Sequence, residues 1–281
     1  MMARFLFWNL GGLVDHRTIV PLLQDGRFDV LVFAECEFDP ELLAFDLSQS
    51  GARSYAPSVG ATIRLRVISA LGEGFIREVY SNATGRLSLR RIRLGAGEIG
   101  LAVVHLKSPV GNWDTRELDG EAQRVATELW QQADLAGLEH LCVLGDFNLQ
   151  PFDYGLSSAH GFFGLMTKES VRIGERTVQG RRFRPLYNPM WGCFGDRTAG
   201  PSGTFHLKDS SPLCYDWHML DQVLFSEGIL PLLVDPGTIL SELGGQTLLD
   251  AKGRPNRQYS DHLPIAFELN LPTGDVGNQE Q

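Results

Sequence analysis

Six short apolar runs of this sequence each carry a polar residue at one end. The runs are rich in β-branched and aromatic residues, as buried strands are, and they span residues 5–9, 30–35, 101–105, 141–148, 220–225 and 260–267. A carboxylate, amide or imidazole at the end of a buried strand is costly unless it is paired or bound to a metal. Because the runs come from both halves of the chain, they predict strands that converge on one polar site.

Length and composition favour one large globular domain. The chain has 281 residues, 43% of them hydrophobic and 21% charged, and large α/β or sandwich folds reach this size undivided. We expect a single domain over 1–271 and a frayed polar tail over 272–281. Since no apolar run is long enough to span a bilayer and the N-terminal run lacks a cleavage site, we expect neither membrane insertion nor a signal peptide.

Charge and cysteine content narrow the class further. A net charge of −9 argues against a protein that binds nucleic acid through its overall charge. It allows a nuclease that places a few cations locally. The four cysteines show no CxxC pair and no metal spacing; they are Cys36, Cys142, Cys193 and Cys214. We therefore expect buried thiols, no disulfides and a reducing, cytoplasmic setting.

The pattern along the chain predicts both strands and helices. Beyond the six runs, we expect helices at 16–27 and 39–49, and glycine-separated strands that form an antiparallel meander at 61–70, 75–80, 87–94 and 98–106. The clearest helix spans 115–135, because apolar residues recur there at steps of three and four. Asp114 or Thr115 is its expected N-cap, and Gly137 lies just past its end.

Residues 165–215 form a long excursion, or lid, rich in Gly, Pro and Arg and without a sustained period. Arginine interleaved with aromatic residues suits a phosphate backbone and stacked bases. A solvated arginine-rich loop is an equally good interpretation. The candidate substrate-binding residues are Arg181, Arg182, Arg184, Tyr187 and Trp191.

The polar residues of the six runs suit a hard divalent cation. Glu35, Asp146 and Asp261 offer carboxylate oxygens, and Asn9 and Asn148 offer carbonyl oxygens, which are the ligands that Mg²⁺ or Mn²⁺ prefers. No Cys or His cluster has the spacing of a zinc site. A single Asp or Asn at a strand end is more often a turn or cap residue, so the prediction depends on the whole set.

Asp221, Asp261 and His262 predict an activated base. A carboxylate that bonds one imidazole nitrogen fixes the tautomer and raises the basicity of the other nitrogen, which can then deprotonate water. His105 is a second candidate, as an acid or a phosphate contact, although alone it would be a core histidine. The sequence has no phosphate-binding GxxxxGK[ST] loop, no GxGxxG motif between strand and helix and no GxSxG elbow.

These residues, in this order, resemble the endonuclease/exonuclease/phosphatase superfamily over about residues 4–270. The motifs that carry the resemblance are Trp8 with Asn9, Glu35, His105, Gly145 to Asn148, Leu220 with Asp221, and Ser260 to His262. The resemblance implies the DNase-I-like fold, an α/β/β/α four-layer sandwich of two mixed β-sheets flanked by helices. It also implies phosphoester hydrolysis that depends on a divalent metal.

The resemblance also implies a role for each site residue. Glu35 becomes the principal metal ligand, with Asn9 in support and Asp261 as a further ligand, while Asp146 and Asn148 orient water and phosphate. His262 becomes the general base, oriented by Asp221, and His105 acts near the leaving group. One departure is Gly11, where many nuclease members carry an acidic residue. Another is the absence of the flanking Trp and Arg that inositol-polyphosphate phosphatases have around the Asp146 motif.

Three hypotheses follow for the function. The first is an Mg²⁺- or Mn²⁺-dependent nuclease that hydrolyses DNA or RNA by in-line attack of water. The second is a phosphatase or phosphodiesterase that acts on a small phosphoester, such as a nucleotide, a lipid headgroup or a sugar phosphate. The third is a catalytically inactive binding module, which the intact set of acids, amides and histidines disfavours.

Overall fold

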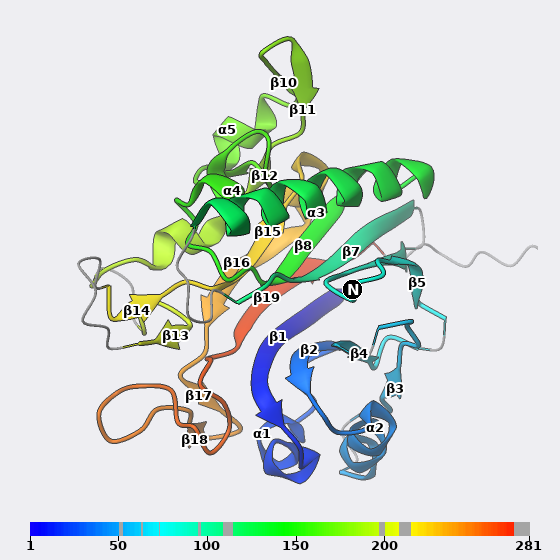
Figure 1. Ribbon diagram of the computed structural model, residues 1–281. Helices are drawn as coiled ribbons and strands as arrows, with labels where there is room; N and C mark the ends of the chain where they lie inside the picture. The colour runs from blue at the N-terminus through cyan, green and yellow to red at the C-terminus, as the bar shows by residue number, and fades with distance from the viewer. Residues whose placement is uncertain are drawn as a thin grey trace, which may run out of the picture.

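The computed structural model describes residues 1–272, apart from 51–52, 63, 73, 95–96, 109–114, 197–199 and 208–214. Asp114, Cys214 and residues 273–281 of the predicted tail therefore lie outside the described residues. Two large mixed sheets face each other, and helices cover their outer faces (Figure 1). This arrangement confirms the predicted four-layer sandwich.

The first sheet joins the two ends of the chain. Its strand order is β16-β19-β1-β2-β4-β3, and β1 pairs parallel with β2 and antiparallel with β19. Its strands are β1 (Met2–Leu13), β2 (Val30–Cys36), β3 (Ala56–Pro57), β4 (Leu65–Ser69), β16 (Leu233–Ile239) and β19 (Ile265–Asn270).

The second sheet holds the predicted meander, with one correction. Its order is β5-β6-β7-β8-β15-β12-β9, and its strands are β5 (Ile76–Ser81), β6 (Leu87–Leu94), β7 (Gly97–His105), β8 (Leu141–Asp146), β9 (Gly164–Leu165), β12 (Leu186–Tyr187) and β15 (Asp221–Phe225). β5, β6 and β7 form the antiparallel meander. The strand expected at 61–70 does not belong to it, because β4 pairs with β2 in the other sheet.

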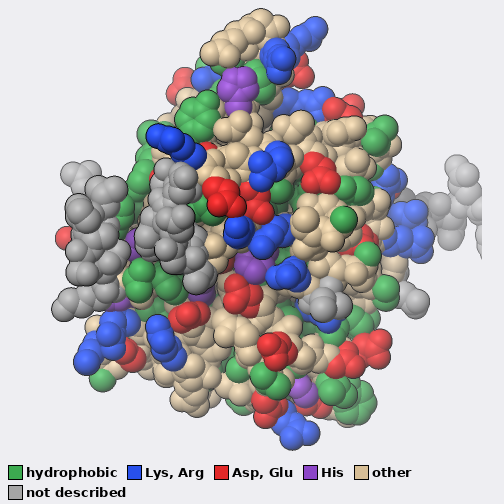
Figure 2. Space-filling view, viewed as in Figure 1, with side chains coloured by type: hydrophobic (Ala, Val, Ile, Leu, Met, Phe, Trp, Pro, Cys, Tyr) green, Lys and Arg blue, Asp and Glu red, His purple; other side chains and the backbone are tan. Residues whose placement is uncertain are grey.

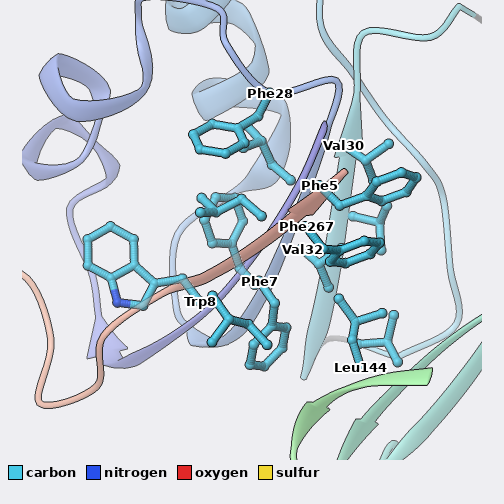
Figure 3. Close-up of a cluster of buried hydrophobic side chains, with 14 of the residues drawn as sticks. Phe5, Phe7, Trp8, Phe28, Val30, Val32, Leu144 and Phe267 are labelled. Carbon is cyan, nitrogen blue, oxygen red and sulfur yellow. The ribbon is translucent and has the colours of Figure 1, made fainter. Parts of the chain in front are cut away.

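Successive side chains of each strand point to opposite faces of its sheet, and those that point inward form the core between the sheets. Phe5 stacks on Phe267 at a centroid distance of 4.6 Å, and Phe225 of the second sheet meets Phe267 edge-on at 5.4 Å. Figure 3 shows Leu144 beside the aromatic side chains of β1 and β19. The alternate residues of β7 and β8, such as Val104 and Val143, lie in a separate cluster with helix α3.

The helices close the sandwich from outside (Figure 1). α3 (Thr115–Leu135) has its predicted bounds and covers the second sheet, and Gly137 follows it at φ +68°. α2 (Pro40–Gln49) also matches its predicted range, whereas the helix expected at 16–27 is only η1 (His16–Thr18) and the single turn α1 (Val20–Leu23). No helix among the described residues is long and apolar enough to cross a membrane.

The excursion contains short elements of its own. β9 and β12 extend the second sheet, because β12 pairs with both β9 and β15. The other short elements of the excursion and of its surroundings are α4 (Tyr154–Ser157), α5 (Lys168–Arg172), β10 (Arg176–Val178), β11 (Arg181–Phe183), η2 (Pro189–Cys193), β13 (Phe205–His206), β14 (Trp217–His218), η3 (Glu227–Leu232), β17 (Glu242–Leu243) and β18 (Gln246–Thr247).

Candidate active site

Strand register brings the polar strand ends together. Asp146 at the end of β8 is paired with His105 of β7 on one side and with Asp221 of β15 on the other. Asn9 of β1 and Glu35 of β2 reach the same place from the facing sheet, since the Asn9 amide nitrogen lies 2.9 Å from Asp146 and 3.3 Å from Glu35. The structure thus places residues of both sheets at one polar site.

Two groups of side chains among the described residues can hold a cation, and Glu35, His105 and Asp146 form the first. Their ligand atoms all lie within 4.8 Å of one another, and His105 Nε2 is 3.0 Å from Glu35 Oε1. The Asn9 side-chain oxygen accepts a hydrogen bond from the Gly11 amide at 3.0 Å, so its NH₂ group donates to both carboxylates. The carboxylate oxygens fit a hard divalent cation, and Asn9 positions them.

The two carboxylates of this group differ in their acidity. The hydrogen bond from His105 is the main cause that lowers the pKa of Glu35 to about 2, against the opposing effect of burial. Burial and the charge of Asp221 raise the pKa of Asp146 above its usual range. Burial without compensation favours the neutral acid, so Asp146 gains most from a nearby positive charge.

Asp221 and His262 form a buried pair beside this group. His262 Nδ1 lies 2.7 Å from Asp221 Oδ2, and Asp221 is fully buried. Burial lowers the pKa of His262, but the charge of Asp221 and the hydrogen bond to it outweigh burial and raise the pKa to about 10. Together with Asp146, the pair forms the second group of possible ligand atoms.

Hydrogen bonds from the first strand fix the loop that carries His262. The Ser260 hydroxyl donates to the Asn9 carbonyl at 2.7 Å and accepts from the His262 amide at 3.0 Å. The Trp8 indole donates to the His262 carbonyl at 2.9 Å. These contacts join the Trp8–Asn9 motif, near the start of the chain, to the Ser260–His262 motif, near its end.

The Asp146 motif has tight backbone requirements. A Cβ atom at Gly145 would lie 1.8 Å from the Val104 carbonyl oxygen, so only glycine fits there. Asn148 has φ +50°, in the left-handed region, and its backbone N–H donates to Asp146 Oδ1 at 2.9 Å. Its side chain donates to the Leu106 carbonyl at 3.1 Å, which holds the turn in this uncommon conformation.

Asp261 belongs to neither group of ligand atoms. A Cβ atom at Gly11, where φ is +56°, would lie 2.7 Å from Asp261 Oδ1. The glycine thus makes room for this carboxylate, and the departure noted at Gly11 has a steric reason. Asp261 remains close enough to His262 to contribute to its raised pKa.

The structure does not bring the predicted arginines to the site. Arg184 lies beside the start of β8, opposite the end that carries Asp146: it pairs with Asp134 at 2.6 Å and covers the Trp130 ring at 4.9 Å. It lines a cavity of about 720 Å³ with His140, which precedes β8. Arg181 and Arg182 belong to the β10–β11 hairpin, which projects away from β13 and β14 (Figure 1).

The two predicted aromatic residues have different environments. Tyr187 is in β12, where Lys168 Nζ lies 5.7 Å from its ring centroid. The Trp191 ring instead packs against the Phe152 ring, with 6.3 Å between the centroids. Phe152 follows the Asp146 motif by a few residues. Of the predicted substrate-binding residues, only Trp191 therefore packs against the segment that follows the Asp146 motif.

The sequence interpretation missed three residues in the surroundings of the base. Phe205 forms an isolated bridge with His262, and the two rings are 4.8 Å apart. The Thr204 hydroxyl accepts from the Asp221 amide at 3.1 Å, and Gln150 bonds His218 at 3.0 Å. Gln150 is the polar residue of an apolar segment just after Asn148, a signal that could have identified it.

Comparison with known proteins assigns this arrangement to a family. A model of the endonuclease/exonuclease/phosphatase family matches residues 6–262. A search of curated proteins finds no match.

Several solved structures share the fold at low identity. The human Nocturnin catalytic domain with bound sulfate is 15% identical, with a TM-score of 0.58 over 96% of this chain and 94% of that chain. Sphingomyelinase C from Streptomyces griseocarneus is 14% identical, with a TM-score of 0.57 over 95% and 99%. D. rerio TDP2, complexed with a single-strand DNA product, is 14% identical, with a TM-score of 0.54 over 96% and 99%.

Proposed function

This chain belongs to the endonuclease/exonuclease/phosphatase family, and from that premise we propose that it is a divalent-metal-dependent nuclease. Members of the family are phosphoester hydrolases, and most depend on a metal. The proposed reaction is the hydrolysis of a DNA or RNA phosphodiester by in-line attack of water. The observation that carries the proposal is the buried Asp221–His262 pair at 2.7 Å, beside Asp146.

The proposed cation is Mg²⁺ or Mn²⁺. Glu35 and Asp146 would hold it, Asn9 would position both carboxylates, and Asp261 is a proposed further ligand. When bound, the cation would neutralise charge on the phosphoryl oxygens and lower the pKa of His262 by repulsion.

The residues of the chain supply the remaining chemistry. Neutral His262 accepts a proton from the attacking water, and Asp221 stabilises the imidazolium that forms. Asn148 orients the phosphate. His105, on the opposite side of Asp146 in the strand register, donates a proton toward the leaving oxygen. Donors that are already in place when charge develops contribute most to such a reaction.

A nucleic-acid substrate is the finer part of the proposal. TDP2, which shares the fold, was solved with a single-strand DNA product, and this supports a strand as the substrate. The mixed surface of the present chain also fits transient binding: Lys and Arg side chains alternate with Asp and Glu on the face drawn in Figure 2. An enzyme that releases its product does not need a continuous basic patch.

The test is a substrate panel with Mg²⁺ or Mn²⁺. Plasmid DNA, single-stranded DNA, RNA and a phosphomonoester are incubated separately with the wild type, with His262→Ala and with the half-buried control His160→Ala, whose ring packs on Phe183. We expect strand cleavage without phosphate release, a loss of about 10²–10⁴-fold in His262→Ala and no loss in the control. Phosphate release from the monoester alone would contradict the nuclease, and no turnover with any substrate would favour a binding module.

We also propose a reducing, cytoplasmic setting. Cys36 and Cys142 are buried free thiols, and burial raises the pKa of each above its usual value. A buried, protonated thiol is inert, so nothing at these two positions calls for an oxidising compartment. Fractionation of cells that express the tagged protein tests this proposal.

A further inference from the structure

Four aromatic side chains next to the site form a cluster, here called the aromatic platform: Phe152, Trp191, Phe194 and Tyr215. The Phe152 ring centroid lies 6.3 Å from that of Trp191, 6.0 Å from that of Phe194 and 5.9 Å from that of Tyr215. The planes cross at 38° to 61°. Tilted rings at these distances attract one another, so the platform holds its own shape.

The platform presents aromatic surface to solvent. Phe152 is 42% exposed and Tyr215 is 50% exposed, and Tyr154, two residues beyond Phe152, is 53% exposed. Among the described residues, Phe45 of α2 is the one other exposed aromatic side chain. Grouped exposed aromatic rings on a folded protein mark a binding surface.

A continuous series of ring contacts joins the platform to the base. Tyr215 lies 6.1 Å from His218, His218 lies 6.3 Å from Phe205, and Phe205 lies 4.8 Å from His262. Gln150 links Phe152 to the same series, because its side chain forms a hydrogen bond with His218 at 3.0 Å and Phe152 follows it by two residues. The platform is therefore connected to the proposed base through two intervening rings, those of His218 and Phe205.

We infer that the aromatic platform binds a nucleobase of the substrate strand, next to the scissile phosphodiester. This inference rests on the proposed function and names the part of the substrate that the chain recognises. Every base has a π face, so stacking on aromatic rings binds a strand without regard to sequence. The chain carries a net charge of −9, and its predicted arginines lie away from the site. Stacking would therefore supply the affinity for the strand that electrostatic attraction does not.

The exposure of the rings favours a base over a lipid headgroup. An aromatic cage for a quaternary ammonium works best when it encloses and desolvates the cation. Phe152 and Tyr215 are about half exposed and offer open ring surface instead. Open surface of this kind suits a planar partner, which can stack while its sugar and phosphate remain in water.

The test compares two single-stranded oligonucleotides of one sequence. One is unmodified, and the other has abasic tetrahydrofuran residues on both sides of the cleaved bond. We expect the wild type to have a KM about tenfold lower for the unmodified strand, about 1.4 kcal/mol. Phe152→Ala and Tyr215→Ala should bring this ratio close to one, Phe152→Tyr should retain it, and the matched exposed-ring control Phe45→Ala should leave it unchanged.

The outcomes separate the inference from the proposed function. A ratio that stays near ten in Phe152→Ala and Tyr215→Ala, or a wild-type ratio of one, overturns the platform while the nuclease stands. If the wild type cleaves neither strand, the nuclease fails, and the affinity ratio of His262→Ala protein for the two strands, measured by fluorescence anisotropy, still decides the platform. Loss of sphingomyelin-vesicle hydrolysis in Phe152→Ala, with nucleic-acid affinity unchanged, would overturn it in favour of a lipid.

Discussion

The replacement Asp221→Asn gives the sharpest test of the electrostatics at the site. In the metal-free protein, Asp221 holds the pKa of His262 at about 10, against the effect of burial. The amide of Asn has nearly the same shape but no charge. Without the carboxylate, burial dominates and His262 releases its proton near neutral pH. The variant therefore removes a charged pair and leaves the packing in place.

The magnitude depends on pH in a defined direction. A histidine whose pKa is raised on folding stabilises the protein fully below its unfolded pKa, about 6.5, and loses this contribution as the pH rises through its folded pKa. We expect Asp221→Asn to lower the free energy of unfolding by about 3–5 kcal/mol near pH 6.5. Near pH 10, where His262 of the wild type also becomes neutral, the difference should shrink to about 1 kcal/mol.

Urea denaturation with EDTA at several pH values between these limits measures the difference. The control is Asp25→Asn, which removes a surface pair with Arg27 at 2.6 Å and should cost no more than about 1 kcal/mol at every pH. A difference for Asp221→Asn that does not change with pH, or that grows as the pH rises, would refute the assigned coupling.

Three further predictions concern the same site. Gly145→Ala should lower the free energy of unfolding by ~3 kcal/mol, because its Cβ would lie 1.8 Å from the backbone oxygen of β7, whereas Gly97→Ala, with nothing within 4 Å, should be nearly neutral in thermal unfolding. Glu35→Gln should weaken Mg²⁺ binding in calorimetry at least tenfold, while the exposed neighbour Glu37→Gln should not. His105→Gln should raise the pKa of Glu35 from about 2 toward its usual value of 4.5, as carbon NMR of the metal-free protein would show.

Local sequence patterns predicted the layers well, because burial repeats along each element. The apolar face of 115–135 and the glycine after it predicted α3 to the residue, and the helix at 39–49 was predicted within one residue. The strand at 61–70 was assigned to the wrong sheet. Its partner is β2, and a periodic pattern contains no information about which distant strand it will pair with.

The substrate-binding prediction shows a second limit of sequence patterns. Arginines and aromatic residues are interleaved along the excursion, but the chain separates them in space. Arg184 turns to Asp134 and Trp130 at the far end of the second sheet, whereas Trp191 turns to Phe152 beside the site. Closeness in sequence does not imply a shared surface where a segment contains many short elements and turns.

The backbone of Glu35 shows how the site departs from local preference. Glu35 has φ +49° at the penultimate position of β2, and Asn148 has φ +50° after β8. A non-glycine residue in this region costs about 1 kcal/mol or more and persists only when its surroundings hold it. At Glu35 those surroundings are the hydrogen bonds of its carboxylate with His105 and Asn9. Glu35 is one of the two carboxylates of the site, and the backbone amide of Asn148 binds the other, Asp146. The strain is therefore explained as the cost of directing ligands from two sheets toward one point.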